Sequence, residues 1–315
     1  EMWSEDGNKF ARCSVVGEPP RTPLPANAPV MIASEDLIKE VLMGGVSEDE
    51  GLYIGRLRSY MDIRVYLPVS RMGRVFVTGK TGSGKSYTVA VMVEELLKKG
   101  VPVVIIDRHG EYSSLKIPVK SIPKEWDIEP RGYQDRIIEF ADLEVNPGAD
   151  IPIEAVLTAD PEDLVLEGIC TIINLRGLPI EYQHLIASEV LMKLYYAIKK
   201  REIKPFFCVI DEAHLFAGKK KSESREAVRL VTQEGRKFGM NLIFVTQRPQ
   251  LLDTTIRAQA GTWIVHCLVD YRDVDVTIRS AEGLSPEWRE TIRLSLIHIS
   301  EPTRPRLISY AVFCL

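Results

Sequence analysis

From residue 74 onward, short apolar runs alternate with longer amphipathic stretches along the chain. The runs are nearly continuous in apolar residues, which is typical of strands that are covered on both faces of a sheet. Between them, apolar residues recur at i, i+3 and i+4, and residues 181–200 give the clearest helix of this kind. Strands that alternate with helices predict an α/β fold with a mostly parallel sheet and right-handed crossovers. The expected strands are residues 74–78, 101–107, 171–175, 206–211, 241–246 and 262–268.

The first part of the chain has a different pattern. Residues 18–29 are rich in proline, which fixes φ and removes backbone donors, so an extended loop is expected there. Apolar and polar residues alternate in 52–55 and 62–68, which is typical of short strands in a small β unit. We therefore expect residues 1–70 to form a partial, β-barrel-like N-terminal region, followed by a main domain over residues 71–293.

Two segments of the remaining chain depart from the strand and helix alternation. Residues 113–168 carry prolines and short helical patterns without a clear strand period, so we expect a helical insertion in the main domain. Residues 294–315 look like the in-frame translation of a transposase-type sequencing adapter. On that resemblance we expect a non-native tail and leave it out of the functional interpretation. A genuine C-terminal strand is the alternative.

Composition limits the class of protein. Hydrophobic residues make up 45% of the chain and the formal net charge is −4, which fits a globular protein without a global field that attracts nucleic acid. No apolar run is long enough to span a bilayer and no signal peptide is visible, so we expect a cytoplasmic location. The five cysteines lie far apart without a C-x-x-C pair, which favours buried thiols over a metal site.

The clearest chemical motif follows the first of these strands. Residues 79–86 have the G-x-x-x-x-G-K-S pattern of a P-loop between a buried strand and an amphipathic helix. Its glycines can adopt positive φ, so that backbone N–H groups point at phosphate oxygens, and the helix adds its positive end. Lys85 is expected to reach the β- and γ-phosphates of ATP, and Ser86 to ligate Mg²⁺. A glycine-rich turn that binds nothing is the alternative. The expected nucleotide contacts are Gly79, Lys80, Thr81, Gly82, Ser83, Gly84, Lys85, Ser86 and Tyr87.

Polar residues at the ends of two other predicted strands complete the candidate site. Asp211 and Glu212 follow an apolar run, so they lie at the sheet edge where open α/β folds bind ligands. Asp211 is suited to the Mg²⁺ shell opposite Ser86, and Glu212 to polarising the attacking water. Gln247 is suited to sensing or positioning the γ-phosphate, although a solvated strand end is the alternative. The acids in the segment 107–111 could support the metal or the water, and turn chemistry explains them about as well.

Basic residues raise two further hypotheses. Arg236 closes a helix before Gly239 and is either an ordinary last-turn cation or an arginine finger, acting in its own subunit or across an interface. Other candidates for that role are Arg71, Arg74 and Arg279.

The second hypothesis concerns a run of lysines after Asp211 and Glu212. Lys219, Lys220 and Lys221 form either a solvated surface loop or contacts to DNA phosphates in the channel of a ring-shaped motor.

Together these motifs resemble the HerA branch of the HerA/FtsK superfamily of P-loop ATPases. The resemblance covers roughly residues 51–288, and Arg108 stands where that family usually has proline. It implies a RecA-like P-loop ATPase core and a homo-hexamer that moves double-stranded DNA through its pore, commonly with a NurA-type nuclease in DNA end processing. It also implies roles for Lys85 and Ser86 in nucleotide binding, Asp211 and Glu212 as metal and catalytic acids, Gln247 as sensor, and Arg236 as an active-site arginine. The motifs are residues 79–86, Asp107-x-His109-Gly110-Glu111-Tyr112, Asp211-Glu212-Ala213-His214, Glu234-Gly235-Arg236-Lys237-Phe238-Gly239 and Thr246-Gln247-Arg248-Pro249.

The leading functional hypothesis is an ATP-dependent double-stranded DNA translocase or helicase of the HerA type, acting in DNA end processing or repair. Two alternatives stay open: a related ATPase that powers conjugative DNA transfer or secretion, and a slow nucleotide-dependent regulatory module. Glu212 argues against the module, because a switch has little use for an activated water.

Overall fold

One large, mostly parallel sheet forms the centre of the computed structural model, which describes residues 2–5, 8–11, 22, 29, 31, 33–43, 46–57, 60–118, 130–219, 222–281, 284, 286, 288–294 and 312–314. The strand order of this nine-stranded sheet is β13-β12-β5-β11-β10-β6-β9-β7-β8. Neighbouring strands pair in parallel except β13, which is antiparallel to β12. The strands are β5 (Arg74–Thr78), β6 (Val103–Asp107), β7 (Ile137–Ala141), β8 (Ile151–Pro152), β9 (Cys170–Asn174), β10 (Phe206–Ile210), β11 (Met240–Thr246), β12 (Thr262–Val265) and β13 (Val312–Cys314).

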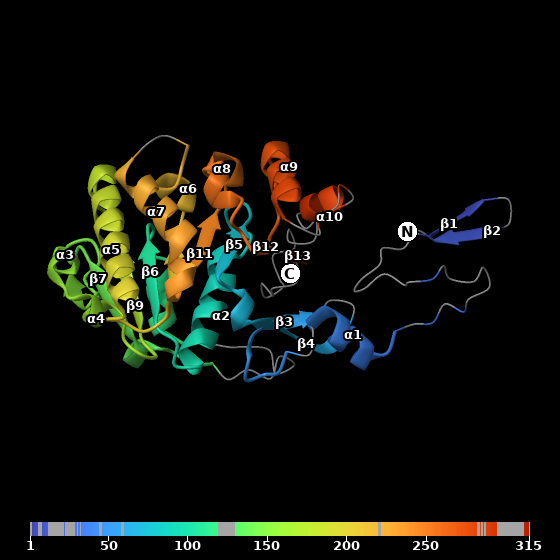
Figure 1. The fold of residues 1–315 in the computed structure, drawn as a ribbon, viewed down its shortest axis with the longest axis horizontal. Helices are drawn as coiled ribbons and strands as arrows, with labels where there is room; N and C mark the ends of the chain where they lie inside the picture. The colour runs from blue at the N-terminus through green and yellow to red at the C-terminus, as the bar shows by residue number, and fades with distance from the viewer. Residues whose placement is uncertain are drawn as a thin grey trace.

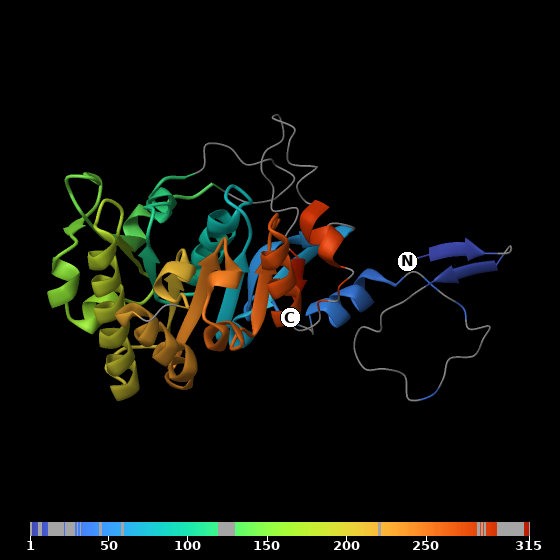
Figure 2. The ribbon, with the colours of Figure 1, turned by 90° about the horizontal axis from the view of Figure 1, so that it is seen from above.

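Helices cover both faces of the sheet, which explains why its strands are apolar throughout (Figures 1 and 2). Alternate strand residues point to opposite faces, so Phe76 packs with α5 (Ile180–Lys200), α7 (Glu223–Glu234) and α9 (Tyr271–Ser280) in one core. Val75 and Val77 pack with α2 (Lys85–Lys98) in the other core. The expected α/β architecture is confirmed.

The strand order brings distant parts of the sequence together. Strand β11 lies between β5 and β10, although both β5 and β10 precede it in the chain. The carboxyl ends of these parallel strands therefore meet at one edge of the sheet. Helices α6 (Ala213–Phe216), α8 (Thr254–Arg257) and α9, which follow β10, β11 and β12, lie along this upper edge in Figure 1.

The described N-terminal residues form separate two-stranded sheets. Strands β1 (Met2–Glu5) and β2 (Asn8–Ala11) form one, and β3 (Gly51–Leu57) and β4 (Tyr60–Pro68) form the other. The β3–β4 hairpin shares the core of α2, and the backbone N–H of Tyr53 donates to Glu95 Oε2 at 3.1 Å. This part of the expected N-terminal region thus packs directly on the helix that follows the P-loop.

The segment expected to be a helical insertion, residues 113–168, contains both strands and helices. Its described residues include the sheet strands β7 and β8 beside two single-turn helices, α3 (Ala155–Thr158) and α4 (Pro161–Leu164). Strand β7 was missed because Glu139 interrupts its apolar pattern. That carboxylate is buried and accepts hydrogen bonds from Ser113 Oγ at 2.6 Å and Asn174 Nδ2 at 2.8 Å, while Lys116 Nζ lies 2.9 Å away.

Two expectations from composition can be compared with the described residues. Cys170, Cys208 and Cys267 are buried free thiols, as expected. Within the described ranges, no helix has the length and apolar character that crossing a membrane requires.

The other helices of the described residues are α1 (Glu35–Met43), α10 (Trp288–Leu294), and the 3₁₀ turns η1 (Val69–Arg71), η2 (Tyr112–Lys116), η4 (Gln134–Arg136), η5 (Gly235–Phe238) and η6 (Pro249–Leu251).

Candidate active site

The P-loop forms a tight turn between β5 and the N-terminus of α2. Gly82 and Gly84 have φ values of 74° and 97°, a region that favours glycine. Gly79 does not adopt positive φ, contrary to expectation, but it is needed for another reason. A Cβ atom at Gly79 would lie 2.5 Å from the Cβ of His266, so this close approach requires a residue without a side chain.

The P-loop lysine and serine both face acidic side chains. Lys85 is almost buried, and its Nζ donates to the carbonyl oxygen of Lys80 at 3.2 Å. Burial lowers the pKa of Lys85, although the nearby Glu212, Asp211 and Glu111 act in the opposite direction. The hydroxyl of Ser86 donates to Glu111 Oε2. The site therefore places a cation and a hydroxyl among several carboxylates.

Asp211 lies in a dense group of acids. Its side chain is buried, and burial together with the charges of Asp107, Glu212 and Glu111 raises its pKa well above the usual value. Such a group favours a proton or a bound cation. Within the described part of the chain, no three His, Cys, Asp or Glu side chains are arranged to hold a metal ion by themselves.

Mg²⁺ does not require a cage of protein ligands. It usually keeps several waters and binds one or two carboxylates together with the phosphates of its substrate. The Ser86 hydroxyl and the Asp211 carboxylate are oxygen donors of the type that this ion prefers. The residues present therefore fit Mg²⁺ that binds together with a nucleotide.

Asp107 organises a loop rather than facing the P-loop directly. Its Oδ1 accepts the backbone N–H groups of His109 at 3.1 Å and Gly110 at 2.9 Å, and its Oδ2 accepts that of Tyr112 at 2.9 Å. These bonds fix the turn that brings Glu111 to Ser86. Turn chemistry thus accounts for Asp107, whereas Glu111 reaches the site itself.

Glu212 has a strained backbone and a histidine partner. Its φ and ψ are both 45°, a left-handed conformation that is uncommon for a residue other than glycine. His214 Nδ1 lies 3.1 Å from Glu212 Oε2 and also 3.1 Å from the hydroxyl of Thr246. Burial would raise the pKa of Glu212, but the neighbouring His214 and the charge of Lys85 outweigh it and lower the pKa. Glu212 is therefore held as a carboxylate.

Gln247 contacts the P-loop directly. The hydroxyl of Thr81 donates to Gln247 Oε1 at 2.6 Å, and the N–H of Gly79 donates to the carbonyl of Thr246 at 3.4 Å. The end of β11 therefore touches the P-loop on one side. The pairing of β11 with β5 brings these residues together.

His266 was not identified from the sequence, although it contacts the P-loop from the other side. It follows β12, is 5% exposed, and its Nδ1 lies 3.0 Å from the carbonyl oxygen of Ser83. Its Nε2 lies 3.1 Å from the hydroxyl of Thr88 on α2. Burial lowers the pKa of His266 to about 4, so the ring is neutral at physiological pH. A single histidine after an apolar run gives no motif by which sequence reasoning could have found it.

The other expected site residues are Arg236, Tyr87 and the lysines that follow α6. Arg236 packs against Gly73, which precedes β5, and therefore lies at the amino edge of the sheet, opposite the P-loop. This position does not bring Arg236 to the P-loop of its own chain. Tyr87 is half-exposed at the start of α2. Lys219 is exposed after α6, and Lys220 and Lys221 lie outside the described residues.

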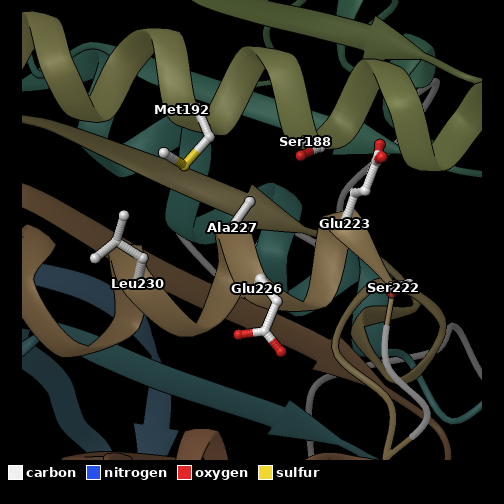
Figure 3. A pocket seen from close by; sticks show the side chains of 7 residues that line it. All are labelled: Ser188, Met192, Ser222, Glu223, Glu226, Ala227 and Leu230. Atoms are coloured by element: carbon white, nitrogen blue, oxygen red, sulfur yellow. The ribbon is translucent and has the colours of Figure 1, made fainter.

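A groove on the outer helical layer is separate from the P-loop. Figure 3 shows that Met192 and Ser188 of α5 face Leu230 and Ala227 of α7 across it. Its lining contains none of the candidate site residues and has neither a glycine-rich turn nor a lysine. The groove therefore gives no reason to move the candidate site from the carboxyl edge of the sheet. Its remaining lining residues are Ser222, Glu223 and Glu226.

Comparisons with known proteins agree on one family. The family model described as "Helicase HerA, central domain" matches residues 52–234. The probable DNA double-strand break repair helicase HerA of Methanocaldococcus jannaschii is 24% identical over 399 residues, covering 90% of this chain and 77% of that protein. The DNA double-strand break repair helicase HerA of Sulfolobus acidocaldarius is also 24% identical, over 85% of this chain and 68% of that protein.

A solved structure supports the fold. The structure of VirB4 of Thermoanaerobacter pseudethanolicus superposes with a TM-score of 0.50 at 14% identity, covering 79% of this chain and 92% of that one. At this identity the likeness concerns the fold alone. The family match contains the P-loop, the acids after β10 and the β3–β4 hairpin within one unit.

Proposed function

The chain belongs to the family of the HerA helicase central domain and is a P-loop ATPase, and we propose that it uses ATP hydrolysis to move double-stranded DNA. The relatives that carry a DNA double-strand break repair helicase name support a role in DNA end processing or repair. We further propose a cytoplasmic homo-hexamer with ATP between subunits, working with a NurA-type nuclease.

One observation supports hydrolysis rather than binding alone. The side chains that follow β10 and β11 converge on the P-loop, with Glu212 held as a carboxylate and Gln247 in contact with Thr81. The buried Glu212 carboxylate lies close enough to Lys85 of the P-loop to interact with its charge, so it is placed to orient an attacking water and accept its proton. A regulatory module that only binds nucleotide would not need this group.

Each side chain then has a distinct task. Lys85 exchanges the carbonyl of Lys80 for phosphate oxygens and offsets their charge. Ser86 and Asp211 would hold Mg²⁺, which would neutralise charge on the phosphates when bound. Glu212 orients the attacking water and accepts its proton. Gln247 contacts the γ-phosphate and senses whether that phosphate is still attached to the nucleotide.

The contact with DNA is proposed for Lys219, Lys220 and Lys221. Lys219 is exposed after α6, at the same edge of the sheet as the P-loop. Lysines in a loop near the hydrolytic acids can attract phosphates without reading base sequence. A movement that starts at Glu212 would reach this loop through the short helix α6.

The proposal is tested by ATPase rate with and without linear duplex DNA, at low and raised salt. We expect DNA to stimulate hydrolysis several-fold at low salt and the stimulation to fall steeply as salt rises, because phosphate contacts release counterions. Glu212→Gln should bind ATP and hydrolyse it at least about 100-fold more slowly, whereas Lys85→Ala should lose binding or turnover. Normal turnover by Glu212→Gln would contradict the assignment of the water-activating acid. An ATPase rate that is the same with and without DNA would favour the secretion-type or regulatory alternatives.

A further inference from the structure

His266 joins the strand beside β5 to the P-loop through both of its ring nitrogens. Nδ1 faces the carbonyl oxygen of Ser83, which can only accept a hydrogen bond, so Nδ1 carries the proton. Nε2 is then an acceptor, and the buried hydroxyl of Thr88 donates to it. The geometry therefore fixes one neutral tautomer.

The bond to Ser83 has a consequence for the neighbouring amide. The carbonyl of Ser83 and the N–H of Gly84 belong to the same planar peptide and point in opposite directions. When His266 holds that carbonyl, it also fixes the direction of the Gly84 N–H. In a P-loop the backbone N–H groups point inward at phosphate oxygens, so each carbonyl that turns outward needs a partner.

The segment after β12 contacts the P-loop at more than this one point. The N–H of His266 donates to the carbonyl of Thr78 at 2.7 Å, and the N–H of Lys80 donates to the carbonyl of Cys267 at 2.7 Å. Gly79 approaches the Cβ of His266 so closely that no side chain fits between them. The ring is therefore clamped between the first turn of α2 and the loop that precedes it.

We propose that His266 is a positioning residue that holds the Ser83–Gly84 peptide in the orientation required to bind the nucleotide phosphates. This inference rests on the proposed function, since it assigns His266 to the same site. It assigns the effect to Nδ1 in particular, because only that nitrogen contacts the peptide.

Two substitutions separate the roles of the two nitrogens. His266→Asn can keep a donor near the position of Nδ1, whereas His266→Gln can keep a polar group near the position of Nε2 and loses the Nδ1 donor. Thr88→Val is the matched control, because it removes only the partner of Nε2 and conserves the shape of the side chain. Binding of ATPγS with Mg²⁺ is measured by calorimetry, together with the melting temperature of the nucleotide-free chains.

We expect His266→Gln to weaken ATPγS binding about tenfold, which corresponds to one lost hydrogen bond. His266→Asn and Thr88→Val should stay within about threefold of the wild type. Equal losses in the Asn and Gln variants would overturn the proposal, because they would indicate packing rather than the Nδ1 bond. So would unchanged binding by His266→Gln.

A second measurement does not depend on nucleotide. Nitrogen-15 spectra of the nucleotide-free wild type should show His266 in the Nδ1–H tautomer, and an Nε2–H tautomer would overturn the proposal. A wild type in the Nδ1–H tautomer that fails to bind ATPγS, or a Lys85→Ala variant that binds it equally well, would overturn the proposed function. The two failures are therefore distinguishable.

Discussion

Asp107 and His266 are buried side chains that bind main-chain atoms of the two loops bordering the candidate site. Asp107 closes the turn that carries Glu111, and His266 holds a carbonyl of the P-loop. Asp211, Glu212 and Gln247 could be selected from the sequence because each ends an apolar run. The supporting contacts of His266 depend on strand pairing and left no local pattern to read.

The first prediction concerns the pH dependence of folding stability at His266. In the unfolded chain the ring has its ordinary pKa of 6.5, whereas burial lowers the folded pKa to about 4. Between these values the unfolded state binds more protons, so the contribution of the neutral ring is complete above pH 6.5 and is lost as pH falls toward 4. The loss should be on the order of 3 kcal/mol.

Urea unfolding of the wild type and His266→Asn at pH 7.5, 5.5 and 4.5 measures this effect. The wild type should lose more stability over this range than the variant does. The exposed His109, replaced by Asn, serves as the control and should follow the wild type. Parallel curves for the wild type and His266→Asn would contradict the prediction.

Among the elements, the central strands and α5 were predictable because both faces of the sheet are covered and the long helix has a regular apolar face. The segment around β7 was not, since the buried Glu139 interrupts its pattern and its partners come from β9 and the η2 turn. The P-loop turn was predicted from its spacing. The position of Arg236 follows from its place directly before β11, since residues that precede a strand of a parallel sheet lie at its amino edge.

The second prediction concerns the contact between α7 and α8. Asp253 Oδ2 accepts Arg225 Nη2 at 2.6 Å, and Asp253 Oδ1 accepts the N–H of Thr255 at 2.8 Å at the start of α8. Replacing Asp253 by Ala removes the cap and leaves the mostly buried guanidinium of Arg225 with its longer ion pair to the exposed Glu226, at 3.5 Å. We expect a loss of about 3 kcal/mol in the free energy of unfolding.

Asp253→Asn separates the contribution of the helix cap from that of the ion pair with Arg225. Asparagine is a good N-cap but carries no charge, so it should recover about 1 kcal/mol relative to Asp253→Ala. Both values come from urea unfolding at neutral pH. An alanine variant as stable as the wild type would show that the contact between α7 and α8 is not held by this residue.

At the scale of the whole molecule, strand order decides which motifs meet. The sequence predicts the strands, but not that β11 inserts between β5 and β10, because that depends on packing between segments far apart in the chain. Once inserted, β11 brings Gln247 to Thr81 and separates Arg236 from the P-loop by the length of β5. One edge of the molecule thus carries the phosphate-binding loop, and the other carries an exposed arginine.

The third prediction follows from this separation. If Arg236 acts on nucleotide, it does so in a neighbouring subunit, so mixing Arg236→Ala chains with Lys85→Ala chains should restore activity. Interfaces that pair an intact Lys85 with an intact Arg236 would form only in the mixture. ATPase rates of each variant alone and of mixtures at several ratios measure this effect, with mass photometry to determine the size of the assembly.

Glu181→Ala is a suitable control, because Glu181 is an exposed residue of α5. Mixtures of this variant with Lys85→Ala should give only the activity expected from dilution. Arg236→Ala mixtures that never exceed the sum of their components would assign Arg236 to a structural role at the amino edge.

The left-handed backbone of Glu212 carries one further implication. A residue with a Cβ atom in this region costs on the order of 1 kcal/mol relative to glycine. Glycine would relieve that cost but has no carboxylate to offer. At this position, folding stability therefore favours glycine and the proposed hydrolysis requires glutamate. A Glu212→Gly chain would be more stable and would lack the carboxylate that hydrolysis needs.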